Sequence, residues 1–302
     1  MSKYVAIDIG GTQIKYGLID ETGTILEDYK IDTEAHLGGP AILDKVGQIV
    51  GTYQAEHELI GVGISSAGMI DPDKGEIFYA GPQIPNYAGT NFKATIELEF
   101  GLPCEAENDV NCAGLAESQV GATRGASVAV CLTIGTGIGG SLLLDGKVFH
   151  GFSNSACEVG YIHLPDGAFQ DLASTTALVT EVAKQVDEPV SNWSGLRIFD
   201  EAKSGNDVCL AAIDRMVDYL GQGIANICYV TNPEIVVLGG GIMAQREFLE
   251  ERIKAALKRH LVSSIADKTR IVFAQNENVA GMLGAYYHFR QKQRVGQKSV
   301  IR

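Results

Sequence analysis

The chain has 302 residues, of which 45% are hydrophobic and 36 are glycine, a composition typical of an α/β enzyme with sizeable cores. Its net charge is −13 and no run of Lys or Arg exceeds a pair, so it lacks the electrostatic footprint of nucleic-acid binding or of attachment to an anionic membrane. No apolar stretch approaches the length of a membrane span, and the N-terminus, which enters a strand by Tyr4, is not typical of a signal peptide.

The cysteines are scattered and form no C-x-x-C pair. Several fall in apolar or helical patterns, where a free thiol behaves as a small hydrophobic group. Reduced thiols are therefore favoured over disulfides or a zinc cage, and we expect a cytoplasmic protein. The six positions are Cys104, Cys112, Cys131, Cys157, Cys209 and Cys228.

The first predicted element is a strand, a tight turn and a second strand over residues 5–20. The turn is Gly10-Gly11-Thr12, where paired glycines allow positive φ and let backbone N–H groups face an anion closely. Asp8 precedes the turn, and a carboxylate beside an anion requires a neutralising cation. A phosphate with Mg²⁺ meets both requirements, and Lys15 adds positive charge.

The same pattern returns over residues 131–146, where Gly135 aligns with Gly10 and Asp145 with Asp20 without a gap. Either copy alone is compatible with an ordinary hairpin. The repetition, together with Asp8 in the first copy, predicts two related lobes that each present a glycine turn to one phosphate ligand between them.

Between the two hairpins, apolar periodicity predicts an alternation of helices and strands. Loops at strand ends are where α/β folds contact ligands, which draws attention to residues 66–71 and 107–111. The predicted elements are a strand from 23, a helix over 41–53, a strand over 59–65, an irregular segment over 75–90, a helix over 91–100, a strand over 104–106 and a helix over 110–120.

After the second hairpin we expect a long loop over 150–172, followed by two helices and a third glycine cluster, Gly239-Gly240-Gly241, at the end of a strand. This cluster is expected to pass under an adenine and its ribose. There is no P-loop and no Rossmann glycine motif. The remaining elements are helices over 173–186, 207–230, 248–260 and 279–289, strands over 235–238 and 271–273, and a solvated basic end from Arg290.

Asn108-Asp109 is the catalytic candidate, because it follows a strand and opens a helix. Both residue types are favoured helix N-caps, and capping is the structural alternative. In the context of phosphate clamps, Asp109 is suited to accept the proton of an alcohol during phosphoryl transfer. The Asn108 amide is suited to a vicinal pair of sugar hydroxyls.

The chain resembles the ROK sugar kinases in the order and spacing of four motifs, Asp8-Ile9-Gly10-Gly11-Thr12, Glu107-Asn108-Asp109-Val110-Asn111, Thr133-Ile134-Gly135-Thr136-Gly137-Ile138-Gly139-Gly140 and Gly239-Gly240-Gly241. The resemblance implies an α/β, two-lobed actin-like ATPase (ribonuclease H-like) fold with mixed sheets, helices on both sides and a cleft between the lobes. It also implies ATP, Mg²⁺, a sugar hydroxyl as acceptor and Asp109 as base. We expect lobes over 1–117 and 118–285, a helix from about 286 to 302 packing back on the first lobe, and a homodimer.

The expected site residues fall into two groups. Asp8 is expected to bind Mg²⁺, directly or through water, and to contact the nucleotide. The other nucleotide-binding residues are expected to be Gly10, Gly11, Thr12, Lys15, Thr133, Gly135, Thr136, Gly137, Gly240 and Gly241. The sugar is assigned to Gly68, Asn86, Asn108, Asp109, Glu158, Tyr161 and Gln170.

Two departures from the family pattern affect the sugar side. Many members follow the glutamate with Gly-His and a cysteine cluster that hold zinc, whereas here Tyr161 takes the histidine position and the cysteines are absent, so we expect no zinc. A second sugar-binding glutamate corresponds to Gln170, with Asp171 as the alternative. His163 is not assumed to replace the missing histidine.

These replacements resemble the zinc-free bacterial β-glucoside kinases, which phosphorylate cellobiose and related sugars at the 6-hydroxyl of the non-reducing glucose. A tyrosine offers an aromatic face suited to a longer saccharide. Glucokinase and N-acetylmannosamine kinase are the alternatives within the family. Trp193 is either a second sugar-stacking residue or a packing residue.

Two other classes of function are weighed. ROK domains occur in sugar-responsive repressors, but the phosphate hairpin begins at residue 4, with no helix-turn-helix before it, and the charge is acidic. A catalytically silent sugar-binding module is disfavoured because Asp8, Asp109 and all three glycine clusters are present.

Overall fold

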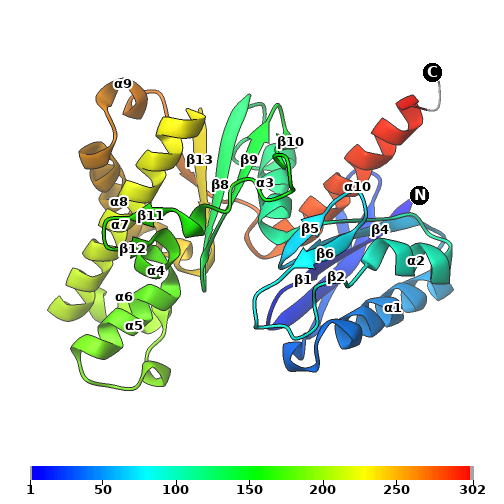
Figure 1. The fold of residues 1–302 in the computed structure, drawn as a ribbon, viewed down its shortest axis with the longest axis horizontal. Coiled ribbons are helices and arrows are strands. Elements are labelled where there is room, and N and C mark those ends of the chain that lie inside the picture. The colour runs from blue at the N-terminus through cyan, green and yellow to red at the C-terminus, as the bar shows by residue number, and fades with distance from the viewer. Residues whose placement is uncertain (1, 300–302) are drawn as a thin grey trace. The chain divides into compact units, whose positions relative to one another are not determined.

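The computed structural model describes residues 2–299, with side chains described up to residue 294. The chain forms two compact units, coloured mainly blue, cyan and red for unit 1 and green to orange for unit 2 in Figure 1. Unit 1 comprises Met1–Gly121, His150–Ser155 and Asn278–Arg302, and unit 2 comprises Ala122–Phe149 and Ala156–Glu277. Each unit is therefore assembled from separate stretches of sequence.

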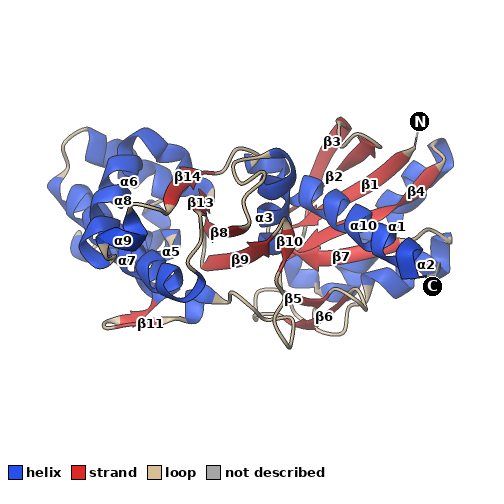
Figure 2. Ribbon diagram, turned by 90° about the horizontal axis from the view of Figure 1, so that it is seen from above, coloured by secondary structure: helices blue, strands red, loops and turns tan. Residues whose placement is uncertain are grey.

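Unit 1 contains a mixed five-stranded sheet in the order β3-β2-β1-β4-β7 (Figure 2). The first three strands form an antiparallel meander, and the last two run parallel to β1. Their bounds are β1 Lys3–Ile9, β2 Gln13–Asp20, β3 Ile25–Asp32, β4 Leu59–Ser66 and β7 Cys104–Asn108. The carboxyl ends of β1, β4 and β7 therefore meet at one edge, which brings Asp8 and Asn108 to the same end of the sheet.

Helices cover both faces of this sheet because its strands are apolar on both sides. Val5, Ile7 and Ile9 of β1 pack into the core beneath α1 (Gly39–Glu56) and α2 (Phe92–Phe100), whereas Tyr4 and Ala6 alternate to the opposite core. That second core contains α3 (Asp109–Val120) and α10 (Ala280–Ser299). The smaller elements are η1 Ala35–Leu37, β5 Met69–Asp71 and β6 Glu76–Tyr79, so the segment expected to be irregular contains a short strand.

Helix α10 lies close to β4 and α3 because glycines stand where a side chain would clash. A Cβ on Gly63 would lie 2.5 Å from the Ala285 carbonyl oxygen, and one on Gly284 would lie 2.0 Å from that of Cys112. The helix also continues beyond residue 289, where the helix predicted over 279–289 ends. Arg290 donates to the Glu21 carbonyl oxygen at 2.9 Å and Lys292 pairs with Asp73, which corrects the prediction of a solvated end for these residues.

Unit 2 repeats the arrangement with a second five-stranded sheet, β10-β9-β8-β13-β14. Again an antiparallel hairpin is joined to two parallel strands, as the repeat in the sequence predicts. The bounds are β8 Val128–Ile134, β9 Ile138–Leu144, β10 Lys147–Val148, β13 Ile235–Gly239 and β14 Arg270–Phe273.

The helices of unit 2 pack on this sheet around α7 (Asp207–Thr231), whose apolar stripe is buried. Its other helices are α4 Phe169–Ala173, α5 Thr175–Gln185, α6 Gly195–Lys203, α8 Arg246–His260 and α9 Ser263–Ala266. Short 3₁₀ turns are η2 Val159–Tyr161, η3 Val190–Asn192, η4 Gly241–Gln245 and η5 Glu277–Val279, the last of which reaches into unit 1, and β11 His163–Leu164 pairs with β12 Gly167–Ala168.

Two segments of unit 2 differ from the sequence prediction. Residues 150–172 were expected to be a loop, yet they contain η2, the β11–β12 pair and most of α4. Helix α6 was not predicted, because it has only nine residues and follows a polar stretch; the Ser194 side chain caps it, and Ile198 and Phe199 bury its apolar face.

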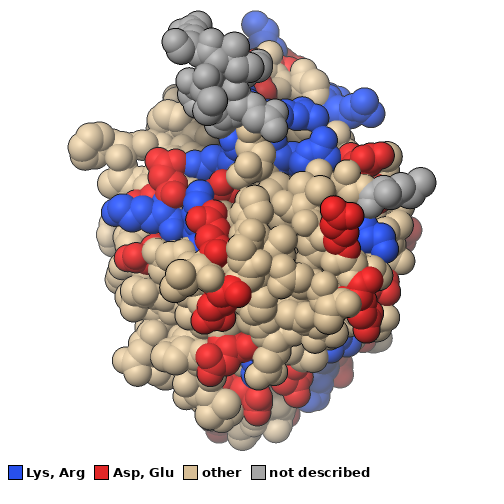
Figure 3. Space-filling model, turned by 90° about the vertical axis from the view of Figure 1, so that its right-hand side faces the viewer, with Lys and Arg blue, Asp and Glu red and all other residues tan. Residues whose placement is uncertain are grey.

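Three further features concern the thiols, the helices and the surface charge. The six cysteines are free thiols. Within residues 2–299, no helix combines the length and apolarity required to cross a bilayer. The face drawn in Figure 3 shows acidic and basic side chains interspersed among uncharged ones.

Candidate active site

The first glycine bend joins β1 to β2 in unit 1. The Gly10 N–H donates to the Gln13 carbonyl oxygen at 3.0 Å, and the buried Thr33 hydroxyl donates to the Gly10 carbonyl oxygen at 2.7 Å. Thr33 also donates its N–H to the Thr12 carbonyl oxygen, so it braces both sides of the bend. This bracing residue was not predicted from the sequence.

The reason for glycine at this bend differs from the prediction. Neither Gly10 nor Gly11 has a positive φ, so left-handed backbone is not what selects them. A Cβ on Gly11 would meet nothing within 4 Å. The missing side chain therefore leaves open space beside the exposed backbone of Gly11 and Thr12, where a ligand can approach.

Asp8 lies at the end of β1, directly before this bend. Its Oδ1 accepts a hydrogen bond from the Ser65 hydroxyl at 2.7 Å. Burial raises the pKa of Asp8 although Ser65 and the charge of Lys15 act to lower it. Lys15 stands opposite Asp8 in the β1–β2 register and donates to the Asn278 carbonyl oxygen at 3.2 Å. A Cβ on Gly281 would lie 2.2 Å from the Asp8 carboxyl carbon, so α10 passes directly over Asp8.

The Asn108 side chain is the N-cap of α3. Its Oδ1 accepts from the backbone N–H groups of Val110 at 2.9 Å and Asn111 at 3.1 Å. Its Nδ2 donates to the Gly68 carbonyl oxygen and to Asp109 Oδ1, both at 3.0 Å. Capping thus applies to Asn108, and the same contacts bring Gly68, Asn108 and Asp109 together.

Asp109 is the first residue of α3 and is not the cap. The hydrogen bonds from Val110 N–H and Asn108 Nδ2 both go to its Oδ1, so neither occupies Oδ2. Burial, followed by the negative charge of Asp8, raises the pKa of Asp109 to about 6. The result is an oriented carboxylate that holds a proton more readily than an ordinary aspartate, which suits a general base.

The second and third glycine segments meet in unit 2. Strands β8 and β13 are parallel neighbours with Thr133 opposite Gly239. Gly240 has φ +103°, and a Cβ there would lie 2.1 Å from the Ile134 carbonyl oxygen, so only glycine fits this approach. The turn of the second segment is closed by Gly135 N–H donating to the Gly137 carbonyl oxygen at 2.9 Å.

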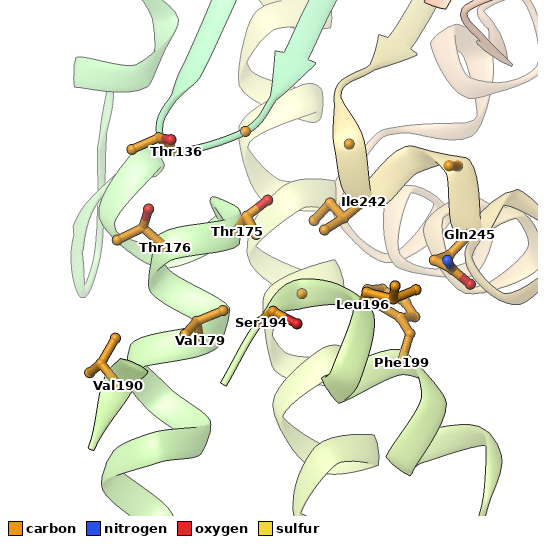
Figure 4. Close-up of a pocket in the computed structure, with 14 residues that line it drawn as sticks. Thr136, Thr175, Thr176, Val179, Val190, Ser194, Leu196, Phe199, Ile242 and Gln245 are labelled. Carbon is orange, nitrogen blue, oxygen red and sulfur yellow. The ribbon is translucent and has the colours of Figure 1, made fainter. Parts of the chain in front are cut away.

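A cavity of about 690 Å³ opens beside these two segments. Gly135 and Thr136 line it from the second segment and Gly241 from the third, and an added Cβ on Gly135 or Gly241 would meet nothing within 4 Å. Figure 4 shows the side chains of α5, α6 and η4 around it. The apolar lining residues are Val179, Val190, Leu196, Phe199 and Ile242, and the polar ones are Thr136, Thr175, Thr176, Ser194 and Gln245.

Most of this lining was missed by sequence reasoning. Its residues come from α5, η3 and α6, which contain no glycine motif. The single available signal was the serine pair Ser174 and Ser194, each of which caps a helix whose first residues, Thr175 and Gly195, line the cavity.

The residues of unit 2 expected to bind the sugar lie on η2 and α4. A Cβ on Gly160 would lie 2.9 Å from Gln170 Oε1, and one on Gly137 would lie 2.8 Å from the same atom. Gln170 therefore stands between the second glycine turn and the segment that carries Glu158 and Tyr161. Burial raises the pKa of Glu158, and the Tyr161 side chain is 55% exposed.

Two other sugar candidates have different surroundings. Asn86 is exposed in the connection before α2, with φ +50°, and no described hydrogen bond joins it to Asn108 or Gly68. Trp193 is buried in the core of unit 2, with the Arg197 guanidinium 4.1 Å from its ring centroid. Trp193 is therefore a packing residue.

No cluster of three or more His, Cys, Asp or Glu side chains is placed to hold a metal among the residues the structure describes. Cys157, which precedes the expected sugar glutamate, has a pKa raised to about 11 by burial and by the charge of Glu158. It is thus a protonated thiol at neutral pH.

Known proteins match the chain along almost its full length. The ROK family model matches residues 4–292. An uncharacterized protein of Clostridium perfringens is 48% identical over 96% of this chain and 99% of its own, and the β-glucoside kinase of Listeria innocua is 32% identical over 96% and 98%. The structure of a ROK family glucokinase from Streptomyces griseus, in complex with glucose and AMPPNP, superposes with a TM-score of 0.83 at 28% identity, covering 96% of this chain and 100% of that one. The chain therefore belongs to the ROK family and has the actin-like ATPase fold of that family's sugar kinases.

Proposed function

We propose that this ROK sugar kinase transfers the γ-phosphoryl group of ATP to the 6-hydroxyl of a β-glucoside such as cellobiose, with Asp109 as general base. One observation carries the proposal. Asp109 is fixed through Oδ1 at the start of α3, its Oδ2 receives no bond from Val110 or Asn108, and its pKa is about 6.

The reaction assigned to this carboxylate is a balanced in-line transfer. Asp109 takes the proton of the sugar hydroxyl, the sugar oxygen forms a bond to the γ-phosphorus, and the bond from that phosphorus to the bridging oxygen breaks to release ADP. A pKa of about 6 leaves most of Asp109 ionised at neutral pH while keeping it basic enough to accept the proton.

The residues around Asp8 fit a magnesium ion. Asp8 and Asp109 repel each other, and burial disfavours the ionised form of both, so a dication beside Asp8 would relieve an unfavourable charge. Asp8 would hold Mg²⁺ directly or through water. When bound, the ion supplies charge neutralisation for the phosphate oxygens of ATP.

We assign the adenosine to the unit 2 cavity, which combines apolar walls for a base with hydroxyl groups for a ribose. The partly exposed turn Gly135–Gly137 is assigned to the phosphates, as are Gly10, Gly11, Thr12 and Lys15. The open space at Gly11, Gly135 and Gly241 supports this assignment.

The residues that we assign to the sugar are Gly68, Asn86, Asn108, Asp109, Glu158, Tyr161 and Gln170. The exposed ring of Tyr161 supports a β-glucoside, because an aromatic face can stack on a second sugar ring. The similarity to the Listeria innocua β-glucoside kinase supports the same choice.

A coupled ADP-release assay with cellobiose, glucose and N-acetylmannosamine tests the acceptor. We expect the highest kcat/KM with cellobiose, and a kcat about 10²–10⁴-fold lower in Asp109→Asn with each of the three sugars. Efficient turnover of glucose with none of cellobiose would replace this proposal with glucokinase, the activity of the Streptomyces griseus relative. Turnover of N-acetylmannosamine alone would indicate the third family activity.

A further inference from the structure

Glu107, a buried carboxylate, immediately precedes Asn108 and Asp109 in the sequence. Glu107 is the penultimate residue of β7, and its side chain is 1% exposed. Its Oε1 accepts from the Asn108 N–H at 2.8 Å and from Asn111 Nδ2 at 3.0 Å. Glu107 thus holds the residue that caps α3 and a second residue in the first turn of that helix.

Two histidines from distant parts of the sequence meet the other oxygen of this carboxylate. His150 Nε2 lies 2.6 Å from Glu107 Oε2, and His288 Nδ1 lies 3.4 Å from it. His288 comes from α10, is almost fully buried, and its Nε2 has no partner among the described groups. Among the residues that the structure describes, this group is not placed to hold a metal.

His150 begins a short segment with an unusual path. The chain belongs to unit 2 up to Phe149 and again from Ala156, whereas His150–Ser155 belongs to unit 1. The His150–Glu107 contact is the described side-chain bond that holds this segment on unit 1. The segment 150–155 is followed closely in sequence by Glu158, an expected sugar ligand.

The charges favour an ionised Glu107–His150 pair. Burial raises the pKa of Glu107, but the His150 hydrogen bond, the charge of His150 and the Asn111 hydrogen bond lower it overall. Burial lowers the pKa of His150, but the bond to and charge of Glu107 raise it overall. The other charged groups acting on the two histidines are Lys292, Asp73 and Lys93. Burial lowers the pKa of His288 to about 4, so it is neutral beside the pair.

We propose that Glu107 is a positioning residue. Its contacts with His150 and His288, here called the clamp, hold residues 108–109 and the segment 150–155 in fixed positions relative to each other. Loss of the clamp would let the general base and this segment move independently. The catalytic consequence rests on the proposed role of Asp109, whereas the ordering of the two segments does not.

Three variants test the clamp. Glu107→Gln keeps the shape but removes the charge, His150→Ala removes the tether, and His150→Gln restores a donor near the position of Nε2. Glu105→Gln is the matched control, because Glu105 lies on the same strand with a side chain 5% exposed but pairs with Lys93 at 2.9 Å and Gln293 at 3.1 Å.

Two readouts separate this proposal from the proposed function. Hydrogen exchange followed by mass spectrometry should show faster exchange over 108–112 and 149–156 in Glu107→Gln and His150→Ala, but not in Glu105→Gln. In the kinase assay, kcat should fall about 10²-fold in both, because a displacement on the order of 1 Å has that effect, with the KM for ATP unchanged and partial recovery in His150→Gln.

The pH dependence supplies a further readout. In the wild type, the clamp should weaken as pH rises through the raised pKa of His150, above its usual 6.5, and that decline of kcat should be absent in His150→Gln. Unchanged exchange in Glu107→Gln and His150→Ala, or equal effects in Glu105→Gln, would overturn the proposal. A wild type without kinase activity would refute the proposed function while the exchange data still decide the clamp. If Glu107→Gln does not fold, His150→Ala decides both readouts.

Discussion

Asp8 and Asp109 occupy the same end of one sheet but are suited to different tasks. Asp8 is bonded to a neutral hydroxyl and covered by Gly281, so its charge is available to a cation. Asp109 is oriented by an amide and a backbone N–H through a single oxygen. In the proposed function, the environment rather than the residue type therefore assigns metal binding to Asp8 and proton transfer to Asp109.

Asp109→Asn should lower kcat by about 10²–10⁴-fold, since a positioned base contributes that much to proton transfer. At pH 7 the same substitution should raise the melting temperature. The folded-state pKa of about 6 lies above the ordinary value of 3.8, so the ionised form is less favourable in the folded state than in the unfolded chain. ADP release and calorimetry would measure the two effects. Wild-type kcat together with a lower melting temperature would contradict the assignment.

The wild-type pH profile should report the same carboxylate. Asp109 must be ionised to accept the proton, so kcat/KM should decline as pH falls through about 6. The assay is a titration of kcat/KM between pH 5 and 8, values that bracket that pKa. A constant kcat/KM down to about pH 5 would mean that another group is the base.

At the scale of elements, three glycine bends use glycine for different reasons. An added Cβ on Gly11 or Gly135 would meet nothing within 4 Å, whereas Gly240 is required by a positive φ and by the Ile134 carbonyl oxygen. Sequence reasoning attributed all three to phosphate or nucleotide contact. It could not separate them, because β13 meets β8 only through pairing between residues about 100 positions apart in the chain.

Paired substitutions in the third bend test this distinction. Gly240→Ala should destabilise the fold by at least about 1–3 kcal/mol, the cost of a non-glycine residue in such backbone. Gly241→Ala should leave thermal unfolding unchanged, because nothing lies within 4 Å of an added Cβ, and should raise the KM for ATP. Equal melting temperatures for the two variants would contradict the geometry, and an unchanged KM in Gly241→Ala would remove this bend from the nucleotide site.

Helix α10 supplies a stability prediction. Because the folded-state pKa of His288 is about 4, below its usual 6.5, the unfolded chain binds a proton first. The stability that neutral His288 provides is complete above pH 6.5 and is lost as pH falls through 4. The difference in melting temperature between the wild type and His288→Asn should therefore shrink over that window. A difference independent of pH would show that His288 is not buried in its neutral form.

Local signals in the sequence predicted the hairpins and the long α7, and offered Asn108 and Asp109 as alternative caps of α3, because each depends on residues close in sequence. They did not predict Thr33 beneath the first bend, the α5 and α6 lining of the cavity, or the Glu107 clamp. In each case the partner comes from another element; His150 is 43 positions from Glu107. Such contacts follow from topology, which periodicity alone does not specify.

For the whole molecule, we predict a metal requirement that differs from that of the ROK members that hold zinc. Dialysis against EDTA should abolish phosphoryl transfer, and Mg²⁺ alone should restore it fully, because the charge to be neutralised lies at Asp8 and the family's zinc ligands are absent from the sequence. Atomic emission of the purified protein provides the control. Recovery that required Zn²⁺ would contradict the expected zinc-free enzyme.

The position of the phosphate on the product tests the proposed reaction directly. Wild-type protein incubated with Mg²⁺-ATP and cellobiose should yield a product whose ³¹P–¹H correlation spectrum places the phosphate on the oxygen of the 6-carbon of the non-reducing glucose. In the same incubation time Asp109→Asn should yield about 10²–10⁴-fold less of it. Unmodified cellobiose, under conditions in which the same wild-type preparation phosphorylates glucose or N-acetylmannosamine, would contradict it.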